Sequence, residues 1–263
     1  MSPTILCDDL TVTLPGESGP VEVLAGVRLA VAKAEFVSVL GTSGSGKTTL
    51  LRALGGLLPV TSGTVHCDST LVTGPPEGVV TVFQDYAHSL LPWRSVARNV
   101  ALGIESRLDR SERDERVDEA LTMVGLSDRA GEYPWRLSGG MQQRVQIARA
   151  LAMRPRVLLM DEPFGALDAM TKASLQDQLQ QVQELTGTTI VFVTHDVEEA
   201  VYLSDRVVVL SGSPASIGLS LDVALPRPRH QITTKERADY LELRHEVYEA
   251  LGHRVPIAER SHG

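Results

Sequence analysis

The stretch "FVSVLGTSGSGKTTL" (residues 36–50) decides how this chain folds. It opens with an apolar, β-branched run, continues as a glycine-rich loop, and ends where a helical pattern begins. The loop matches G-x-x-x-x-G-K-[ST], a motif that requires a strand before it and a helix after it. Its glycines let backbone N–H groups curl around phosphate oxygens beside a helix N-terminus. The stretch therefore predicts an α/β core that binds a nucleoside triphosphate.

Two side chains of this loop have chemistry of their own. Lys47 is expected to reach the β- and γ-phosphates, and Thr48 to offer its hydroxyl to Mg²⁺. An ordinary glycine-rich turn is the alternative, and the strand and helix patterns on either side disfavour it. The residues predicted to hold the nucleotide are Gly41, Thr42, Ser43, Gly44, Ser45, Gly46, Lys47, Thr48 and Thr49.

Four more short apolar runs extend the sheet outward from this stretch. They are residues 79–83, 157–160, 189–193 and 206–210. Continuous β-branched runs of this length are typical of strands buried on both faces, as in a parallel sheet. Helical stretches lie between several of them, so the core is predicted to be α/β.

The regions around this core differ from it in pattern. The first thirty-odd residues alternate between apolar and polar, which predicts antiparallel strands joined by the turn-rich "PGESGP" (15–20). Residues 84–156 show almost no strand signal and include the charge-alternating stretch 105–121, which indicates a helical lobe with an exposed helix face. Near the end, Thr233 and Glu236 have the spacing of a capping box and predict the start of a final helix.

We therefore expect a P-loop NTPase core with a mostly parallel sheet, an N-terminal antiparallel β-subdomain and an inserted α-helical subdomain. The core with its β-subdomain is assigned to residues 1–87 and 155–212. The helical subdomain is assigned to residues 88–154, and a C-terminal extension ending in a helix to residues 213–263.

Composition limits the possible function classes. The net charge of −8 argues against a general nucleic-acid binder, because phosphate backbones require a concentrated basic surface. Cys7 and Cys67 have no metal-ligand spacing, so reduced thiols are expected. The N-terminus lacks the pattern of a secretory signal, and no apolar run has the length of a membrane span. These features predict a soluble cytosolic protein that needs a partner for any role at a membrane.

Polar side chains follow three of the predicted strands. Asp161 and Glu162 end one strand, where Asp161 could hold Mg²⁺ and Glu162 could polarise the attacking water as a general base. Gln84 and His195 follow two others; Gln84 could orient water or touch the metal, and His195 could contact the γ-phosphate. Each could also be an ordinary turn residue, but their common position at the edge that carries the phosphate loop favours a catalytic role for Glu162, His195 and Gln84.

The stretch "LSGGMQQR" (137–144) contains no obvious catalyst. Ser138 can cap the helix that follows, and Gly139 and Gly140 leave the backbone N–H groups of its first turn bare. A helix N-terminus of this kind forms an anion site. It would be a second anion site, because the loop at 41–48 already binds the phosphates of this chain's own nucleotide. The alternative is a glycine-rich helix cap that binds no ligand.

In this order, the motifs resemble the ATP-binding cassette (ABC) family, and the resemblance covers nearly the whole chain. The ordered set is "GTSGSGKTT", Gln84, "LSGGMQQR", "VLLMDEP", the "ALD" of residues 166–168 and His195. The resemblance implies two cassettes packed head to tail, a homodimer in the simplest case. Each ATP would be held between the phosphate loop of one subunit and the "LSGGMQ" of the other, which assigns Ser138, Gly139, Gly140 and Gln142 to the partner's nucleotide. ATP and Mg²⁺ are the implied ligands, with Thr48, Gln84 and Asp161 at the metal.

The finer resemblance is to cassettes of bacterial importers for nitrate, sulfonate and taurine. It rests on residues 90–105, 133–151, 194–210 and 225–229. One departure concerns the base: the family usually stacks an aromatic residue of the N-terminal β-region on adenine, whereas the matching place falls near Leu14, and no Phe, Tyr or Trp precedes Phe36. Adenine stacking by that region is therefore not expected.

An importer ATPase subunit is the leading functional hypothesis. Its expected place is the cytoplasmic face of the inner membrane, against permease subunits contacted through Leu90–Trp93, with a periplasmic solute-binding protein as an indirect partner and no nucleic acid. The alternative for Leu90–Trp93 is packing of the helical lobe against the core. Rival functions are a soluble cassette in DNA repair or translation, which usually has tandem cassettes or long coiled coils, and a small-molecule kinase, which has no need for "LSGGMQQR".

Overall fold

The computed structural model describes residues 3–17, 19–85 and 89–252, and its centre is the predicted parallel sheet. The five apolar runs form β3 (Phe36–Gly41), β6 (Val79–Val82), β7 (Val157–Asp161), β8 (Thr189–Val193) and β9 (Arg206–Gly212). They lie in the order β9-β3-β8-β7-β6, and every neighbouring pair is parallel. All residues of β3, β7 and β8 are buried, as the continuous apolar runs predicted.

The antiparallel strands are hydrogen-bonded to the same sheet. They are β1 (Ile5–Gly16), β2 (Gly19–Val31), β4 (Ser62–Cys67), β5 (Thr70–Leu71) and β10 (Ala215–Asp222). In the described part of the chain the order of the ten strands is β5-β4-β1-β2-β10-β9-β3-β8-β7-β6. β10, which the sequence analysis did not predict, joins the two halves, because it pairs antiparallel with β9 and its residue Ala215 pairs with Leu24 of β2.

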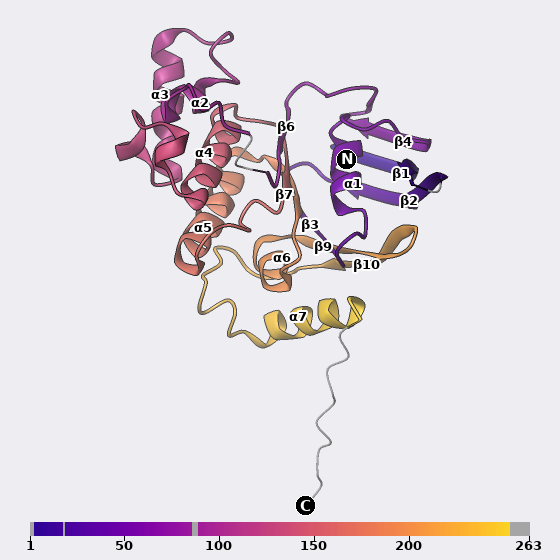
Figure 1. The fold of residues 1–263 in the computed structure, drawn as a ribbon. Helices are drawn as coiled ribbons and strands as arrows, with labels where there is room; N and C mark the ends of the chain where they lie inside the picture. Colours follow the sequence, from indigo (N-terminus) through magenta and orange to yellow (C-terminus); the bar gives the residue numbers. More distant parts are fainter. Residues whose placement is uncertain (1–2, 18, 86–88, 253–263) are drawn as a thin grey trace, which may run out of the picture.

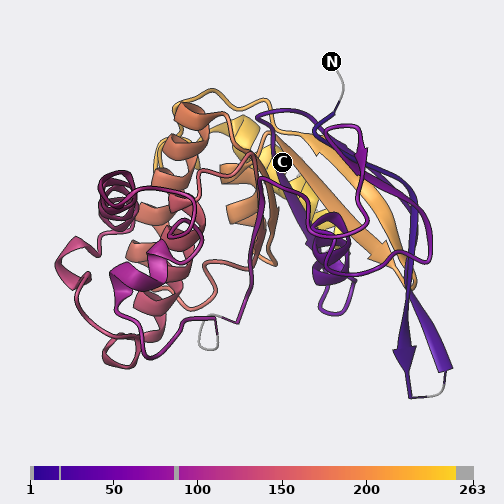
Figure 2. The ribbon, with the colours of Figure 1, turned by 90° about the horizontal axis from the view of Figure 1, so that it is seen from above.

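Two apolar clusters lie on opposite faces of the central strands. Val37 and Val39 of β3 join one cluster with α1 (Lys47–Leu54) and strands β1 and β2. Phe36 and Leu40 of the same strand join the other cluster, which contains the remaining helices. The alternation follows from the period of two along a strand. As Figures 1 and 2 show, α1 is thus held on the β-rich side, away from the helices inserted between β6 and β7.

Those inserted helices confirm the predicted helical lobe. They are α2 (Val96–Ala101), α3 (Arg110–Met123) and α4 (Gly139–Ala152). Asp109 caps α3 by accepting a hydrogen bond from the backbone N–H of Glu112 at 2.9 Å. Of the residues in α3, only Val117, Ala120 and Leu121 are buried, so the charge-alternating stretch does form an exposed helix face.

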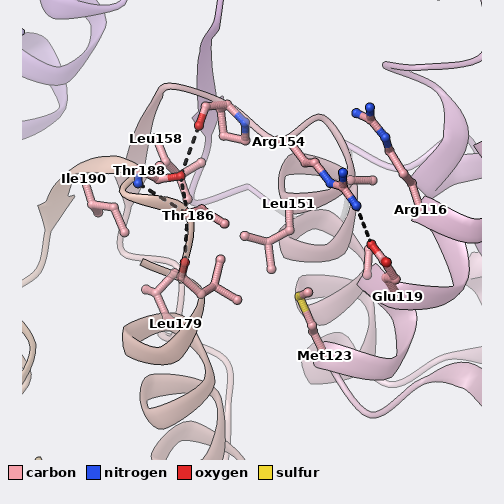
Figure 3. A pocket seen from close by; sticks show the side chains of 14 residues that line it. Arg116, Glu119, Met123, Leu151, Arg154, Leu158, Leu179, Thr186, Thr188 and Ile190 are labelled. Carbon is pink, nitrogen blue, oxygen red and sulfur yellow. Dashed lines mark hydrogen bonds and ion pairs between the residues drawn. The ribbon is translucent and has the colours of Figure 1, made fainter. Parts of the chain in front are cut away.

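The boundary between this lobe and the core contains an apolar cavity of about 260 Å³. Figure 3 shows Leu151 of α4, Leu158 of β7 and Leu179 of α5 (Ala169–Thr186) around it, with the ion pair between Arg154 and Glu119 at one side. None of its lining residues is among the predicted site residues. The packing between lobe and core is therefore incomplete at this place.

The C-terminal helix begins later than predicted, and the capping-box prediction is wrong. The helix α7 spans Ala238–Ala250, and its N-cap is Arg237, which makes no side-chain capping bond. Residues 231–236 form turns instead. Asp239, in the first turn, accepts from both Arg237 and its own neighbour Tyr240, and so supplies the polar contact at this helix start. α7 packs on α6 (Val197–Leu203), where Arg244 pairs with Glu198 at 3.0 Å.

Within the described residues, no helix combines the length and the apolar character needed to cross a membrane.

Candidate nucleotide-binding site

The phosphate loop lies between β3 and α1, as its sequence predicts. Gly44 and Gly46 have φ angles of 80° and 82°, in the left-handed region that favours glycine. At Gly41, a Cβ would lie 2.9 Å from the carbonyl oxygen of Leu210 and closer still to Ser45 Oγ, so only glycine fits there. The loop backbone can therefore close around a small anion.

Lys47 is held inside this loop. Its Nζ donates to the carbonyl oxygens of Gly41 at 2.8 Å and Thr42 at 3.0 Å, and the side chain is buried. Burial lowers the pKa of Lys47, while the nearby carboxylates of Glu162 and Asp161 act in the opposite direction. Its ammonium is thus placed at the loop with two backbone acceptors and two carboxylates around it.

The predicted metal ligands Thr48 and Asp161 are brought together. Asp161 is the last residue of β7 and is buried, and its carboxylate accepts a hydrogen bond from the Thr48 hydroxyl. Burial raises the pKa of Asp161, and the Thr48 bond opposes that rise. The Thr48 hydroxyl of α1 and the Asp161 carboxylate of β7 therefore lie side by side next to the phosphate loop, where both oxygens could bind a metal ion.

Two predicted catalytic residues, Gln84 and His195, converge on a carboxylate oxygen of the third, Glu162. Glu162 Oε2 lies 3.1 Å from Nδ1 of His195 and accepts a hydrogen bond from Nε2 of Gln84 at 3.2 Å. The three residues follow β7, β8 and β6, which are neighbouring parallel strands, so their carboxyl ends meet at one edge of the sheet. Glu162, His195 and Gln84 line a pocket of about 590 Å³ together with residues 43–49 and Val23.

This pocket fits a magnesium-bound nucleoside triphosphate. Ser45 Oγ is buried and has no hydrogen-bond partner in the described residues, so the loop contains a polar atom that a phosphate oxygen would satisfy. Thr48 and Asp161 provide the oxygen donors that Mg²⁺ prefers. Lys47, which is buried, also lines this pocket and supplies a positive charge for the phosphates.

The signature stretch is built as predicted but lies elsewhere. Ser138 caps α4 by accepting from the backbone N–H of Met141 at 3.3 Å, and Gly139 and Gly140 are its first two residues. Neither these residues nor Gln142 line the pocket at the phosphate loop of their own chain. They form a second helix N-terminus with bare N–H groups, on the helical side of the sheet (Figure 1).

Two glutamines of this stretch have backbone partners. Gln142 donates from Nε2 to the carbonyl oxygens of Pro134 at 2.9 Å and Leu137 at 3.3 Å, so its amide nitrogen braces the turn that precedes the signature. Gln143, which the sequence analysis did not single out, is buried; it donates to the carbonyl oxygen of Glu162 and accepts from the N–H of Ala166. The one sequence feature that could have pointed to Gln143 is its position next to Gln142 in "GGMQQR". Gln143 links the signature helix to the Asp161-Glu162 segment.

Comparison with known proteins agrees with this geometry. The sequence profile of ABC transporters matches residues 24–165. The nitrate transport protein NasD of Klebsiella oxytoca is 43% identical over 98% of this chain and 100% of its own length. The nitrate import ATP-binding protein NrtC of Synechococcus elongatus is 48% identical over 89% of this chain, which spans only 36% of that longer protein. A solved dimeric ATP-binding cassette, bound to ADP and Pi in a post-hydrolysis state, is 32% identical with a TM-score of 0.76, over 83% of this chain and 98% of that one.

The chain belongs to the ABC transporter family. Its described residues have the fold of that ATP-binding cassette, including the β1–β2 hairpin and the helices inserted between β6 and β7. The ordered motifs of the sequence are thus those of the ABC transporter family, and they lie on the fold of an ATP-binding cassette.

The nucleoside end of the cassette's pocket is aliphatic. Leu14 lies opposite Val21 in the β1–β2 hairpin and packs against the apolar cluster around α1. Val23, on β2, is the hairpin residue that lines the pocket, and a Cβ on Gly46 would lie 3.1 Å from its Cγ1. No Phe, Tyr or Trp lines this pocket in the part of the chain that the structure describes.

The stretch Leu90–Trp93 divides between core and surface. Leu90 is buried in the helical cluster, so the alternative of packing within the lobe holds at this residue and the expected permease contact does not include it. Its burial follows from the buried Asn99, which exchanges two hydrogen bonds with the backbone of Leu91 and fixes the turn. Trp93, by contrast, is 72% exposed and lines a groove of about 700 Å³ beside α2 and α3.

Proposed function

We propose that this cassette is the ATP-hydrolysing subunit of a bacterial importer for a nitrate-, sulfonate- or taurine-like solute, with nitrate the first to test. The convergence of Gln84 and His195 on Glu162 beside the phosphate loop supports ATP hydrolysis. The match to a nitrate transport protein over its full length supports nitrate. The subunit would be peripheral, on the cytoplasmic face of the inner membrane, because a permease must supply the membrane-spanning part.

In this proposal the chain's own residues have separate tasks. The N–H groups of residues 41–49 and the ammonium of Lys47 bind the phosphates of ATP. Thr48, Asp161 and Gln84 would hold Mg²⁺, which when bound neutralises charge on the phosphates. Glu162 takes the proton of the attacking water, and His195 and Gln84 orient that carboxylate.

The signature stretch completes the site of a second subunit. Ser138, Gly139 and Gly140 carry donors for an anion but do not reach their own chain's pocket. In a head-to-tail homodimer they would clasp the γ-phosphate held by the partner's phosphate loop, and Gln142 would brace them. A ligand that binds only the dimer shifts the equilibrium toward it, so ATP would close the dimer and hydrolysis would open it.

The groove beside Trp93 is the proposed contact for a permease helix. Its lining includes four guanidinium groups and two carboxylates in addition to the exposed indole: Arg94, Arg98, Arg110, Arg113, Glu105 and Asp114. An exposed tryptophan above a charged groove is a typical interface anchor. Gln84 and Trp93 lie on the same connection between β6 and α2, so a nucleotide-dependent change at Gln84 can reach the permease contact.

The test is reconstitution of the cassette in proteoliposomes with the permease and the solute-binding protein of a nitrate import system. Nitrate is expected to stimulate ATP turnover and to accumulate in the vesicles, whereas bicarbonate and taurine are not. Stimulation by bicarbonate or taurine instead would overturn the nitrate assignment. Turnover without any permease association would overturn the importer assignment.

A second measurement addresses the groove. In Trp93→Ala, permease association or nitrate-stimulated turnover is expected to fall while ATP turnover of the isolated cassette persists. Ile232→Ala, a change at another exposed apolar residue far along the chain, is the matched control. Wild-type assembly and transport in a folded Trp93→Ala variant would move the permease contact elsewhere on the helical lobe.

A further inference from the structure

The cassette lacks an aromatic residue where its own pocket would receive the base. The pocket is lined by Val23 at the hairpin, and the place expected to carry an aromatic ring holds Leu14, which is partly buried and packs against the apolar cluster around α1. A base stacked on an aromatic side chain gains roughly 1–3 kcal/mol in nucleic-acid complexes. An ATP bound to one cassette alone would therefore leave its adenine without a stacking partner.

An exposed aromatic stack lies directly before the signature stretch. The rings of Tyr133 and Trp135 are 5.7 Å apart and inclined by 18°, and the guanidinium of Arg136 lies 5.1 Å from the centre of the Trp135 ring. Trp135 is 64% exposed and Tyr133 is 40% exposed, so the stack is open to solvent rather than part of the core. Aromatic faces and guanidinium planes are the groups on which bases stack.

The stack is fixed relative to the signature. Pro134–Arg136 form a 3₁₀ helix that ends one residue before Leu137, and Gln142 of α4 donates to the carbonyl oxygens of both Pro134 and Leu137. The N–H of Val96 in α2 donates to the carbonyl oxygen of Glu132 at 2.7 Å and holds the other end. Any movement of Ser138 toward a ligand therefore carries the stack with it.

We propose that this stack binds the adenine base of the ATP held by the partner subunit. The inference rests on the proposed head-to-tail dimer, in which Ser138 contacts the γ-phosphate of that nucleotide. Ser138 lies three positions after Trp135, a reach of at most about 10 Å, which is comparable to the distance from the terminal phosphate of a nucleotide to its base. The base-binding surface that the β1–β2 hairpin lacks is then supplied by the opposite subunit.

This arrangement makes base recognition a property of the dimer. A monomer would bind ATP mainly through its phosphates and discriminate weakly between bases, because Val23 offers no aromatic face. The closing dimer would prefer a purine that stacks well on Trp135. Nucleotide selection and dimer closure would then be one step.

Fluorescence tests the proposal, because the chain has two tryptophans. In Trp93→Phe, Trp135 is the sole indole, and ATP-driven dimerisation is expected to quench its emission. Inorganic triphosphate, which has no base, is the control probe and should not quench the Trp135 emission. Unchanged Trp135 emission in a dimer driven by ATP would overturn the inference and leave the proposed function intact. Absence of any ATP-driven dimer would overturn both.

A variant pair gives the second readout. Trp135→Ala is expected to raise the ATP concentration at half-maximal dimerisation by about five-fold or more. Trp135→Phe keeps an aromatic ring and should bring this concentration back close to the wild-type value. In the Ser138→Arg background, where only monomers are expected, Trp135→Ala should leave ATP binding unchanged. If Trp135→Ala dimerises at the wild-type ATP concentration but loses the permease, the stack is a permease contact and the inference is wrong.

Discussion

Glu162 shows how the chain places its proposed base at the cost of local strain. Its φ of 44° lies in the left-handed region, where a non-glycine residue costs of order 1–3 kcal/mol. Two hydrogen bonds hold Glu162 in this conformation. Its backbone N–H donates to the carbonyl oxygen of Val193, and its backbone carbonyl oxygen accepts from Nε2 of Gln143. Strain of this kind persists where the surroundings over-determine the backbone, and here it aims one carboxylate at the phosphate loop.

ATP turnover should depend on the carboxylate of Glu162. Glu162→Gln keeps the shape of the side chain but removes the base, so ATP hydrolysis should fall by about 10²–10⁴-fold. ATP binding should persist, and an ATP-bound dimer should accumulate because hydrolysis no longer dissolves it. Glu119→Gln, the same change on α3, is the control. Near-wild-type turnover in Glu162→Gln, measured by phosphate release, would contradict the assignment.

A second residue-scale prediction concerns pH. Burial raises the pKa of Cys7 from 9.0 to about 12, so the unfolded chain loses this proton at a lower pH than the folded chain. The folded state then binds more protons, and stability should fall as pH rises from about 9 toward 12, by up to about 1.4 kcal/mol per pH unit from this group. Guanidinium unfolding of wild type and Cys7→Ala at pH 8 and pH 10 checks this. An equal loss in both proteins would assign the effect to other groups.

At the scale of elements, the boundary between the helical lobe and the core combines fixed and loose parts. Gln143 of α4 ties the lobe to residues 162–166. Farther from the site, the cavity in Figure 3 leaves α3 and α5 incompletely packed. A lobe held at one end and loosely packed at the other can rotate when nucleotide binds, whereas a close-packed boundary resists rotation.

Filling this cavity should therefore separate stability from activity. Ala120→Leu adds three carbon atoms where α3 lines the cavity, a gain of roughly 2 kcal/mol if all of them are buried without strain. We expect a higher free energy of unfolding and a lower rate of ATP turnover, because the lobe is locked. Denaturant unfolding and steady-state turnover measure the two. A stabilised variant with full turnover would show that the lobe does not need this freedom.

At the scale of the molecule, the parts predictable from sequence were those with strong local signals. Buried strands and the phosphate loop have continuous apolar runs and a motif, and both were confirmed. β10 was missed because its serines and glycine are typical of a loop. Its partly buried residues Ile217, Leu219 and Leu221 nevertheless alternate with exposed ones and pack against the apolar clusters. The capping box near Thr233 failed because residues 231–236 form turns, and Asp239 supplies the polar contact at the later helix start. The burial of Leu90 depends on Asn99, nine residues away, which no local pattern shows.

The candidate site depended on topology as well as on motifs. Gln84, Glu162 and His195 are far apart in sequence, and only the order of parallel strands brings them together. The sequence predicted that convergence from the carboxyl edge of the sheet. It did not predict the roles of Gln142 and Gln143 in bracing the signature, since side-chain to backbone bonds depend on the folded geometry.

Each ATP site is proposed to be shared by two subunits, and mixing two inactive variants tests this sharing. Ser138→Arg should spare ATP binding to the monomer but prevent dimerisation and turnover, because only the signature is blocked. Lys47→Ala removes the phosphate-loop cation from its own site. In an equal mixture, a pair of one subunit of each kind has one intact site out of two. With about half of the subunit pairs mixed, ATP turnover should recover to about a quarter of wild type, whereas each variant alone stays inactive. Failure of the mixture to recover turnover, or loss of monomeric ATP binding in Ser138→Arg, would contradict the shared site and make the signature a structural cap of its own chain.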